Sequence, residues 1–408
     1  MSAVTTRPVT PTAPTRQDRR ARAAVAALFL TNGAVFFNVV PRYPEIKADL
    51  GLTNTVFGTA LAGYPIGALL AGLLAGAAIR RFRSSRVAVY GVLLTTVATL
   101  AVAVAPNWVT FGAVLFVVGA LDAIVDVAQN AHGLRVQRRY RRSIVNSLHG
   151  VWSIGAVLGG LMGTAAAGLH LPLAIHLTIS AVLFSAVALV AYWFLLPGTD
   201  EDDRDPAAAP VHRGRSFTGV AVKMLAVLGV LAACGALVED AGASWGAIYL
   251  SGDLHTSAAT AGLAVVSLQV AMTVGRLTGD RLVDRFGQRT VVRAGGALAA
   301  IGMGAALAMP SVGMSLAGFA LAGLGTATLI PAAMHTADEL PGLPPGTGLT
   351  IVSWLLRGGL LLSPPLVGFV ADLASLRVGL LTVVAAGLLT FALARVLVNR
   401  TGPQTPPA

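Results

Sequence analysis

Residues 279–289 read GDRLVDRFGQR, a short charged segment between two long apolar runs. Five of its eleven side chains are charged, whereas the runs before and after it, at about 258–279 and 290–309, are almost entirely apolar. An α-helix needs about 20 apolar residues to cross a bilayer. A charged segment between two such runs is typical of a connection between two membrane-spanning helices.

The same alternation continues along the whole chain of 408 residues, of which only 12% are charged and whose mean hydropathy is +0.75. Soluble domains carry about 25% charged residues. Helices are expected rather than an open sheet, because lipid cannot satisfy the backbone groups of a strand edge. The sequence therefore predicts an all-α membrane protein with 12 transmembrane helices, at about 23–41, 55–79, 87–105, 109–134, 143–168, 173–196, 221–250, 258–279, 290–309, 313–337, 347–370 and 377–398.

The basic residues indicate the orientation of these spans. The even-numbered connections and the two tails hold 25 of the 29 Lys and Arg residues, the odd-numbered connections hold three, and Arg357 lies inside a span. Basic residues accumulate in cytoplasmic loops of membrane proteins. We expect a multi-pass protein of the cytoplasmic membrane with both termini in the cytoplasm. This distribution also explains the net charge of +11 without a nucleic-acid partner.

The chain divides into two related halves. We expect a tail at 1–22, a six-helix bundle at 23–196, a linker at 197–220, a second bundle at 221–398 and a tail at 399–408. An offset of 204 residues superimposes the halves: it carries Asp49-Leu50 onto Asp253-Leu254, Gly58 onto Gly262, Arg81-Phe82 onto Arg285-Phe286, Gly119 onto Gly323 and Gly155 onto Gly359. Parallel repeats of six spans are the internal symmetry of major facilitator transporters.

The segment at 279–289 resembles the signature loop of the major facilitator superfamily, Gly-x-x-x-Asp-Arg-x-Gly-x-Arg/Lys. The resemblance implies two pseudo-symmetric six-helix bundles and a conformational latch formed by Asp284, Arg285, Gly287 and Arg289. The copy in the first half keeps Arg81, but Arg80 stands where the family has Asp and Arg83 where it has Gly. Asp284 is therefore the better latch candidate.

Further motifs look like the fucose-permease-like branch of this superfamily, which includes proton-coupled sugar symporters. They are Asp126-x-x-x-Asn130-x-His132-Gly133, the segment from Ser147 to Gly155, Glu239 followed by Trp245, and Pro364-Pro365-x-x-Gly368. The chain departs from the branch at Ser244, which often is Asp, and at Gln137, which often is Glu. The resemblance implies proton-coupled transport but does not identify a substrate.

Charged residues inside the predicted spans are the candidates for proton coupling. Asp122 and Asp126 lie one helical turn apart in the fourth span, and Glu239 and Asp240 lie in the seventh. A charge at the centre of a bilayer costs at least about 2.5–3.5 kcal/mol, so such residues face a cavity or a partner. A buried carboxylate that loads and releases a proton would serve coupling. The alternative is a static ion pair that fixes the packing of the helices.

Arg357 is predicted to be the countercharge for one of these acids, and two further interpretations stay open. It would bind an anionic substrate directly, or it would form a structural ion pair. Other polar and aromatic residues inside the predicted spans are candidates for contact with a substrate, with simple packing as the alternative for each: Asn38, Tyr64, Asn130, His149, Trp152 and Trp245.

These features predict a secondary active transporter that moves a small hydroxylated or polar compound by proton symport. Proton-driven efflux of a drug or natural product is the alternative. A membrane enzyme or receptor scaffold is the remote one, because the seven His residues show no metal-ligand spacing and the chain has no Gly-x-x-x-x-Gly-Lys-Ser/Thr motif for ATP. We expect no cofactor and no metal. The expected partners are protons, a small molecule and the bilayer, and we expect a monomer.

Overall fold

The computed structural model describes residues 14–140, 144–198, 219–340, 343 and 347–397. Throughout this part of the chain the regular structure is helical, and twelve helical segments are long and apolar enough to cross a membrane. The expected number of spans is thus confirmed. Both predicted tails lie wholly or mostly outside the described residues, as does most of the linker predicted at 197–220.

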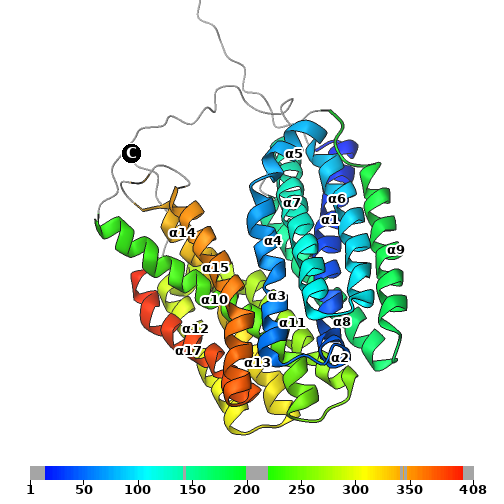
Figure 1. Ribbon diagram of the computed structural model, residues 1–408. Helices are drawn as coiled ribbons and strands as arrows, with labels where there is room; N and C mark the ends of the chain where they lie inside the picture. The colour runs from blue at the N-terminus through cyan, green and yellow to red at the C-terminus, as the bar shows by residue number, and fades with distance from the viewer. Residues whose placement is uncertain (1–13, 141–143, 199–218, 341–342, 344–346, 398–408) are drawn as a thin grey trace, which may run out of the picture.

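The first six spans form one bundle, the N half, on the right of Figure 1. Two of its spans are interrupted. The first continues through a short 3-10 segment into α2, and the second bends twice into α3, α4 and α5. The elements are α1 (Arg16–Val39), η1 (Val40–Arg42), α2 (Tyr43–Asp49), α3 (Asn54–Leu61), α4 (Gly63–Gly72), α5 (Ala75–Phe82), α6 (Ser84–Leu100), η2 (Ala101–Val104), α7 (Trp108–Tyr140), α8 (Val145–Gly168) and α9 (Leu173–Tyr192).

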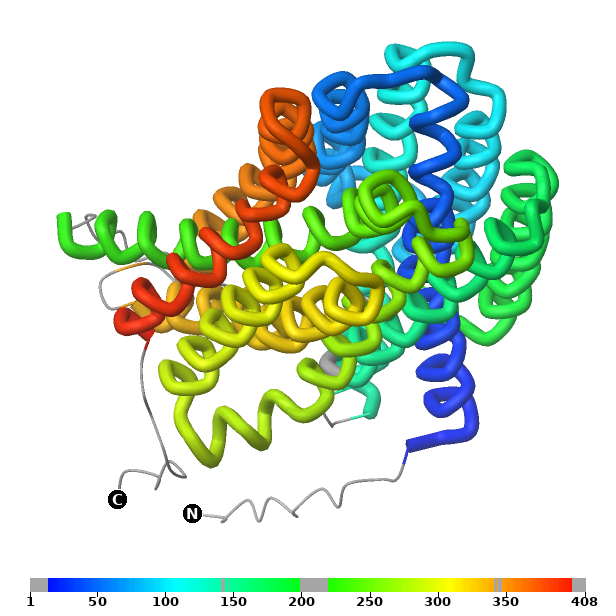
Figure 2. The backbone as a smooth tube through the Cα atoms, turned by 90° about the horizontal axis from the view of Figure 1, so that it is seen from below, coloured from blue at the N-terminus to red at the C-terminus, as the bar shows by residue number. Residues whose placement is uncertain are grey.

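The last six spans form the C half, on the left of Figure 1, and the separation is also clear from below in Figure 2. Its tenth span is broken between α13 and α14, and its last between α16 and α17. The elements are α10 (Gly219–Gly252), α11 (Ala258–Phe286), α12 (Gln288–Ala308), α13 (Val312–Thr326), α14 (Leu329–Asp338), α15 (Thr347–Leu373), α16 (Leu376–Gly379), α17 (Leu381–Leu393) and η3 (Ala394–Val396).

The two halves pack like copies of one scaffold. Gly119 of α7 lies against the backbone of Tyr64 in α4, and Gly323 of α13 lies against the backbone of Leu268 in α11. Tyr64 and Leu268 are themselves 204 residues apart. Only a glycine allows helix backbones to approach this closely in a membrane bundle. The matched contacts explain why these glycines recur at one offset.

Two predicted boundaries need correction, because α7 and α11 extend well beyond the apolar runs. The helix α7 continues to Tyr140, and α11 continues to Phe286, so most of the charged segment at 279–289 is helical rather than a loop. Helix ends outside the hydrocarbon region are set by capping rather than by lipid. Gly287, at a φ of 81°, ends α11 and starts α12.

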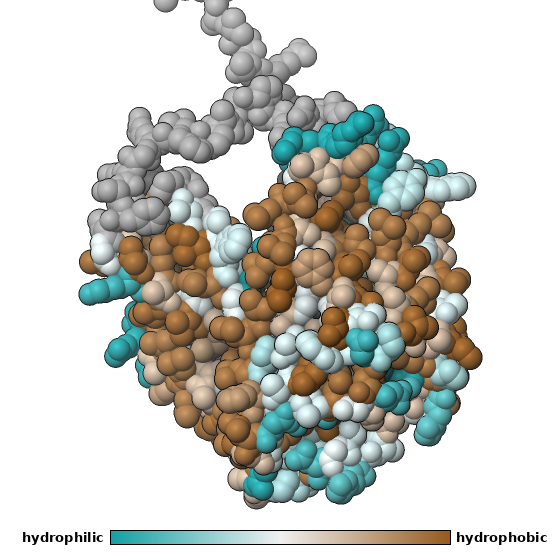
Figure 3. Space-filling view, in the orientation of Figure 1, coloured by the Kyte–Doolittle hydropathy of each residue, from teal (hydrophilic) through white to brown (hydrophobic). Residues whose placement is uncertain are grey.

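The halves meet at one end of the molecule and part at the other. We call the end where α5 and α11 terminate the basic end, because the arginines at 80–86 and 281–289 lie there. The space-filling view shows a hollow between the halves at this end and apolar side chains over both flanks (Figure 3). At the opposite end, Gly58 and Gly368 lie against backbone atoms of Pro364 and Asn54 from the other half.

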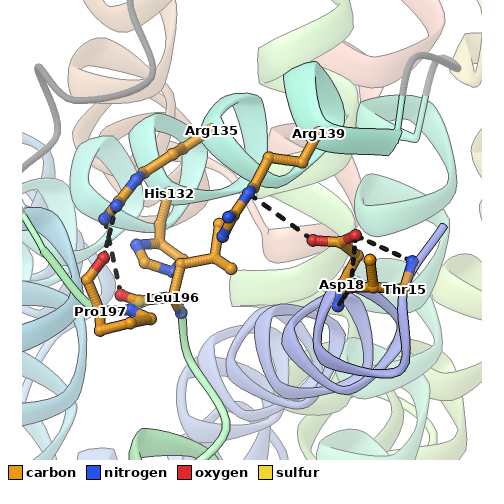
Figure 4. A network of polar contacts seen from close by, with 7 residues as sticks. All are labelled: Thr15, Asp18, His132, Arg135, Arg139, Leu196 and Pro197. Atoms are coloured by element: carbon orange, nitrogen blue, oxygen red, sulfur yellow. Dashed lines mark hydrogen bonds and ion pairs between the residues drawn. The ribbon is translucent and has the colours of Figure 1, made fainter. Parts of the chain in front are cut away.

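The basic end of the N half is held together by a polar network that joins three spans (Figure 4). Arg139 of α7 pairs with Asp18 near the start of α1 at 3.7 Å, and Asp18 also completes the N-cap of α1 with Thr15. Arg135 donates to the carbonyls of Leu196 and Pro197, beyond the end of α9. These contacts connect α1, α7 and the segment after α9 at this end.

A candidate transport site between the two halves

The buried acid Asp122 is held by neutral hydrogen-bond donors from two other spans. Asn32 Nδ2 of α1 donates to Asp122 Oδ1 at 2.6 Å, and the Tyr64 hydroxyl of α4 donates to Asp122 Oδ2 at 2.7 Å. The Trp152 indole N–H of α8 donates to Asn32 Oδ1 at 2.8 Å. One polar network thus links α1, α4, α7 and α8 inside the N half.

The predicted candidates Asp126 and Asn130 continue this polar face along α7. Asn130 Nδ2 donates to both the backbone carbonyl and the Oδ1 atom of Asp126, at 2.9 Å and 3.0 Å. Asp126 also interacts electrostatically with Arg357 of α15, which belongs to the C half. Asp126 and Asn130 are therefore hydrogen-bonded to each other along α7, and the role of Asp122 and Asp126 in proton coupling stays a prediction.

The C half contributes an ion pair that reaches into the N half. Arg276 Nη2 of α11 lies 3.2 Å from Glu239 Oε2 of α10, and Arg276 Nη1 donates to Ser153 Oγ of α8 at 3.4 Å. The guanidinium carbon also lies 6.0 Å from the centroid of the Trp152 ring, within the range of a cation–π contact. Trp152 therefore contacts both the Asp122 network and the Glu239–Arg276 pair.

This ion pair corrects the sequence analysis on one point. From the sequence, Arg276 was counted among the 25 basic residues of the even-numbered connections and the tails, and only Arg357 was placed inside a span. In the structure Arg276 lies ten residues before the end of α11, and it is the partner of Glu239. The helix α11 continues past the apolar run. Arg276, near the end of that run, was therefore wrongly counted as part of a connection.

Arg357 is the second arginine that the C half directs toward the N half. It lies on α15, whereas Arg276 lies on α11. Arg357 is half-buried, and its Nη1 atom lies 3.7 Å from where a Cβ on Gly72 of α4 would be. Within the described residues it makes no hydrogen bond or ion pair at contact distance. Arg357 of the C half thus reaches α4 of the N half, while Glu239 is paired with Arg276 instead.

Asp240 lies beside Glu239 but in different surroundings. Ser244 Oγ donates to Asp240 Oδ1 at 3.1 Å, whereas Asp240 Oδ2 is buried without a hydrogen-bond partner among the described residues. Ser244 is the residue at which the chain departs from the fucose-permease-like pattern, and the structure gives it a contact with this second acid.

His149 lies one turn before Ser153 on α8. Its ring makes an edge-to-face contact with Phe29 of α1 at 5.3 Å between centroids, and its backbone carbonyl accepts from Ser153 Oγ. His149 also interacts electrostatically with Arg276. It therefore borders the ion pair without bonding to it directly.

Two predicted substrate candidates lie away from this group. Asn38 is fully buried within the N half, where it donates to Ser180 Oγ at 2.7 Å and meets His176 Nε2 at 2.7 Å, both of α9. Trp245 is also fully buried, with its ring 6.0 Å from that of Phe57 at the packed end of the molecule. Neither faces the hollow between the halves.

Three residues that complete the group, Asn32, Ser153 and Arg276, were not predicted as site residues. Asn32 and Asn38 both lie in the first span, six residues apart, so they occupy different faces of α1. An all-apolar helix gives no periodic signal for the face that lines a cavity. Asn32 is distinguished from Asn38 by its hydrogen bond to Asp122 of α7. This contact exists only in the packed structure, so the sequence alone does not reveal it.

The predicted latch residues lie at the open, basic end. Asp284 and Arg285 are exposed, and within the described residues Asp284 makes no hydrogen bond or ion pair. Arg289 Nε donates to the Leu397 carbonyl at 3.0 Å, which ties α12 to the end of the last span. Arg81 and Arg285 each stack on the phenylalanine that follows, at 5.6 Å and 5.3 Å. Their role as a latch stays a prediction.

A contact at the packed end was not predicted. The carboxylate of Asp372, near the end of α15, accepts from the backbone N–H groups of Asn54 and Thr55 at 3.0 Å and 2.7 Å. It thus caps the first turn of α3 in the other half, where the helix dipole favours a negative charge. The contact closes the interface between the second and eleventh spans.

Comparisons with known proteins agree with this architecture. The family model of the Major Facilitator Superfamily matches residues 25–239 and 225–408. Membrane protein MosC of Rhizobium meliloti is 32% identical over 368 residues, which is 90% of this chain and 87% of that protein. An uncharacterized MFS-type transporter of Yersinia pestis is 29% identical, over 83% of this chain and 85% of its own length.

Solved structures show the same fold at low identity. The nucleoside transporter NupG gives a TM-score of 0.72 at 14% identity and covers 94% of this chain and 99% of its own. An inward-facing, occupied bacterial homologue of Spinster gives 0.68 at 17%, over 92% and 95%. The fucose:proton symporter FucP of E. coli gives 0.58 at 17%, over 93% and 99%.

Proposed function

The chain belongs to the major facilitator superfamily and is therefore a membrane transporter, and on this premise we propose that it carries a small polar solute together with protons by symport. The proposed site lies between the halves, around Trp152 and Arg276. The observation that carries the proposal is the unbroken series Tyr64, Asp122, Asn32, Trp152, Arg276 and Glu239, which joins six spans from both halves.

Asp122 and Asp126 are the proposed proton carriers. Both hydrogen bonds to the Asp122 carboxylate come from neutral groups, Asn32 and Tyr64, so no formal positive charge contacts it. A buried carboxylate without a paired cation is costly in a membrane, and protonation relieves this cost. Glu239, in contrast, has the Arg276 guanidinium as its ion-pair partner.

Relative motion of the two halves is proposed to couple solute binding to proton transfer. The Arg276 guanidinium touches Ser153 and Trp152 of the N half and Glu239 of the C half, so a solute that binds at Trp152 competes with these contacts. Hydroxyl and amide groups of a polar solute match the donors and acceptors present there. We propose that the basic end faces the cytoplasm, as its arginine content predicts. The structure would then represent the inward-open state.

Solute-driven proton flux tests this function. The purified protein is reconstituted into liposomes that enclose a pH-sensitive dye, and a panel of sugars, polyols and nucleosides is added outside. Symport predicts acidification of the lumen on addition of the transported solute, without an imposed gradient. Solute transport without proton movement, or proton movement in the opposite direction, would contradict symport, and the latter would favour efflux.

Replacing Asp126 by Asn keeps the shape of the side chain and removes its titration. We expect Asp126→Asn to lose solute-driven proton flux while it retains part of the exchange of labelled solute between the two sides. The matched control is Asp49→Asn, which neutralises an exposed carboxylate at the packed end of the molecule. Normal proton flux in Asp126→Asn would exclude Asp126 as a carrier.

A further inference from the structure

The N half has a lateral groove that the transport site does not use. It has a volume of about 540 Å³ and lies between α5, α6 and α7 near the basic end. Its walls are apolar or aromatic, with Phe82, Tyr90, Leu94 and Leu121 among them, and Arg86 is its one charged lining residue. Phe82, Tyr90 and Leu94 are each about half exposed, so the groove opens on the flank that faces the bilayer.

In the C half the equivalent place is a close helix contact. There, Gly295 of α12 lies against the backbone of Gly325 in α13, so the two helices touch. The residue that matches Gly295 is Gly91, which also lines the groove, but the residue that matches Gly325 is Leu121. In the N half Gly91 instead lies against the side chain of Val125 in α7. The groove therefore lies at a place where the two repeats differ in sequence.

The charged residue that lines the groove, Arg86, has no charged counterpart in the C half. Arg86 lies in the first turn of α6, and the matching residue of the C half is Thr290. The segment 80–86 contains four arginines and no acid. Basic clusters next to a membrane helix attract anionic lipid head groups. From Arg86 to Leu94 the groove follows α6 for eight residues, or about 12 Å at 1.5 Å per residue.

We propose that this groove is a binding site for one anionic phospholipid of the leaflet at the basic end. The phosphate group lies at Arg86, and one acyl chain runs along the groove past Tyr90 and Leu94. Tyr90 and Tyr192, whose rings lie 6.0 Å apart, both line the groove, where tyrosines place their polar ends at the level of the head groups.

Lipid-dependent thermal unfolding of the full chain in mild detergent tests the site. Phosphatidylglycerol is expected to raise the unfolding midpoint more than phosphatidylcholine does. In Arg86→Gln the affinity for phosphatidylglycerol should fall about fivefold, the effect of about one basic residue near an anionic lipid. The control is Arg293→Gln, which removes an exposed arginine at the basic end of the C half that stacks on Phe391.

A second variant tests the acyl chain. Leu94→Trp places a larger side chain in the groove at a half-exposed position, so it should leave folding intact and weaken both lipids. Equal losses in Arg86→Gln and Arg293→Gln would overturn the proposal in favour of a diffuse charge effect. Stabilisation by inorganic phosphate that matches phosphatidylglycerol, or an unaltered lipid response in Leu94→Trp, would show that no acyl chain occupies the groove.

Discussion

The two halves share one scaffold but carry different polar side chains. At the repeat offset, Asp122 and Asp126 of the N half correspond to Thr326 and Ile330, and Tyr64 corresponds to Leu268. The contacts of Gly119 with Tyr64 and of Gly323 with Leu268 nevertheless match. The repeat therefore fixes where the helices lie, and the later divergence of a few side chains decides which half holds which charge.

The two arginines of the interface show this most clearly. Arg276 contacts Ser153, and Arg357 lies beside Gly72. With the offset of 204, Gly72 is the counterpart of Arg276, and Ser153 is the counterpart of Arg357. Each arginine thus faces the position where the other would lie in the opposite half. Arg276 and Arg357 belong to the C half, whereas Asp122 and Asp126 belong to the N half. Separation of the halves therefore changes the electrostatic energy of these four side chains.

The largest effect is expected from breaking the ion pair of the C half. Arg276→Ala leaves Glu239 without its cation and should reduce the free energy of unfolding by about 3 kcal/mol, the lower end of the range for a buried pair, because both side chains are partly exposed. Thermal unfolding in detergent measures this. Arg276→Ala combined with Glu239→Gln should recover most of the stability but not transport. No recovery in the double variant would show that Arg276 stabilises the fold mainly through Ser153 and Trp152.

Removing the second arginine should affect transport more than stability. Arg357 has no contact ion pair among the described residues, so Arg357→Ala should fold normally and unfold within about 1 kcal/mol of the parent. If Arg357 binds an anionic group of the solute, the variant loses only anionic solutes in a liposome uptake panel. If it acts on Asp126 across the gap, all solutes lose pH-driven accumulation. Normal transport of every solute would exclude both roles.

Much of this arrangement was predictable because lipid imposes a simple rule on the sequence. Each span needs about 20 apolar residues, and the twelve runs meet this requirement without help from tertiary contacts. Asp122, Asp126 and Asn130 were predictable as a polar face because they are four residues apart in one helix. The conserved backbone geometry of the repeat was visible in glycines, since a helix contact of this kind requires them.

The partners of these residues were not predictable, because they lie far away in the sequence. Arg276 is 37 residues from Glu239 and 123 from Ser153, and nothing local marks either contact. Asn38 and Asn32 looked equivalent in an apolar helix, and only packing against α7 and α9 separates them. Asp372 lay beyond the predicted end of its span, so its contact with α3 had no signal.

The packed end offers a smaller test of the same comparison. Asp372 caps α3 across the interface of the second and eleventh spans, whereas its counterpart Gly168 simply packs against Ala259 at the interface of the fifth and eighth. Asp372→Ala should therefore loosen one interface by about 1 kcal/mol, the value of a capping interaction, and raise the population open at this end about fivefold. Distances between spin labels across the packed end measure the shift.

The fold itself should survive this substitution, because Thr53 also caps α3 through its own side chain. Asp49→Asn serves as the control, since it neutralises an exposed acid at the same end. An unchanged distance distribution in Asp372→Ala would show that apolar packing alone holds the end closed.

A similarly small effect is expected from the turn that both halves share. Arg83, between α5 and α6, has φ 72° and ψ 146°, and its counterpart Gly287, between α11 and α12, has φ 81° and ψ 148°. The backbone of the turn is thus the same in both copies, although the N half has lost the glycine. A residue with a Cβ is strained by about 1–3 kcal/mol in such a conformation, and glycine is not.

Arg83→Gly should therefore stabilise the protein by about 1 kcal/mol, since the greater freedom of glycine in the unfolded chain offsets part of the relieved strain. The reverse exchange, Gly287→Ala, should destabilise it by a similar amount. The midpoint of thermal unfolding measures both changes, and Arg81→Gln controls for the loss of an exposed positive charge near the same turn. A rise in the midpoint for Arg83→Gly and a fall for Gly287→Ala would establish that the turn with Arg83 is strained and the turn with Gly287 is not. A loss of stability in Arg83→Gly would instead mean that the arginine side chain contributes more than its strained backbone costs.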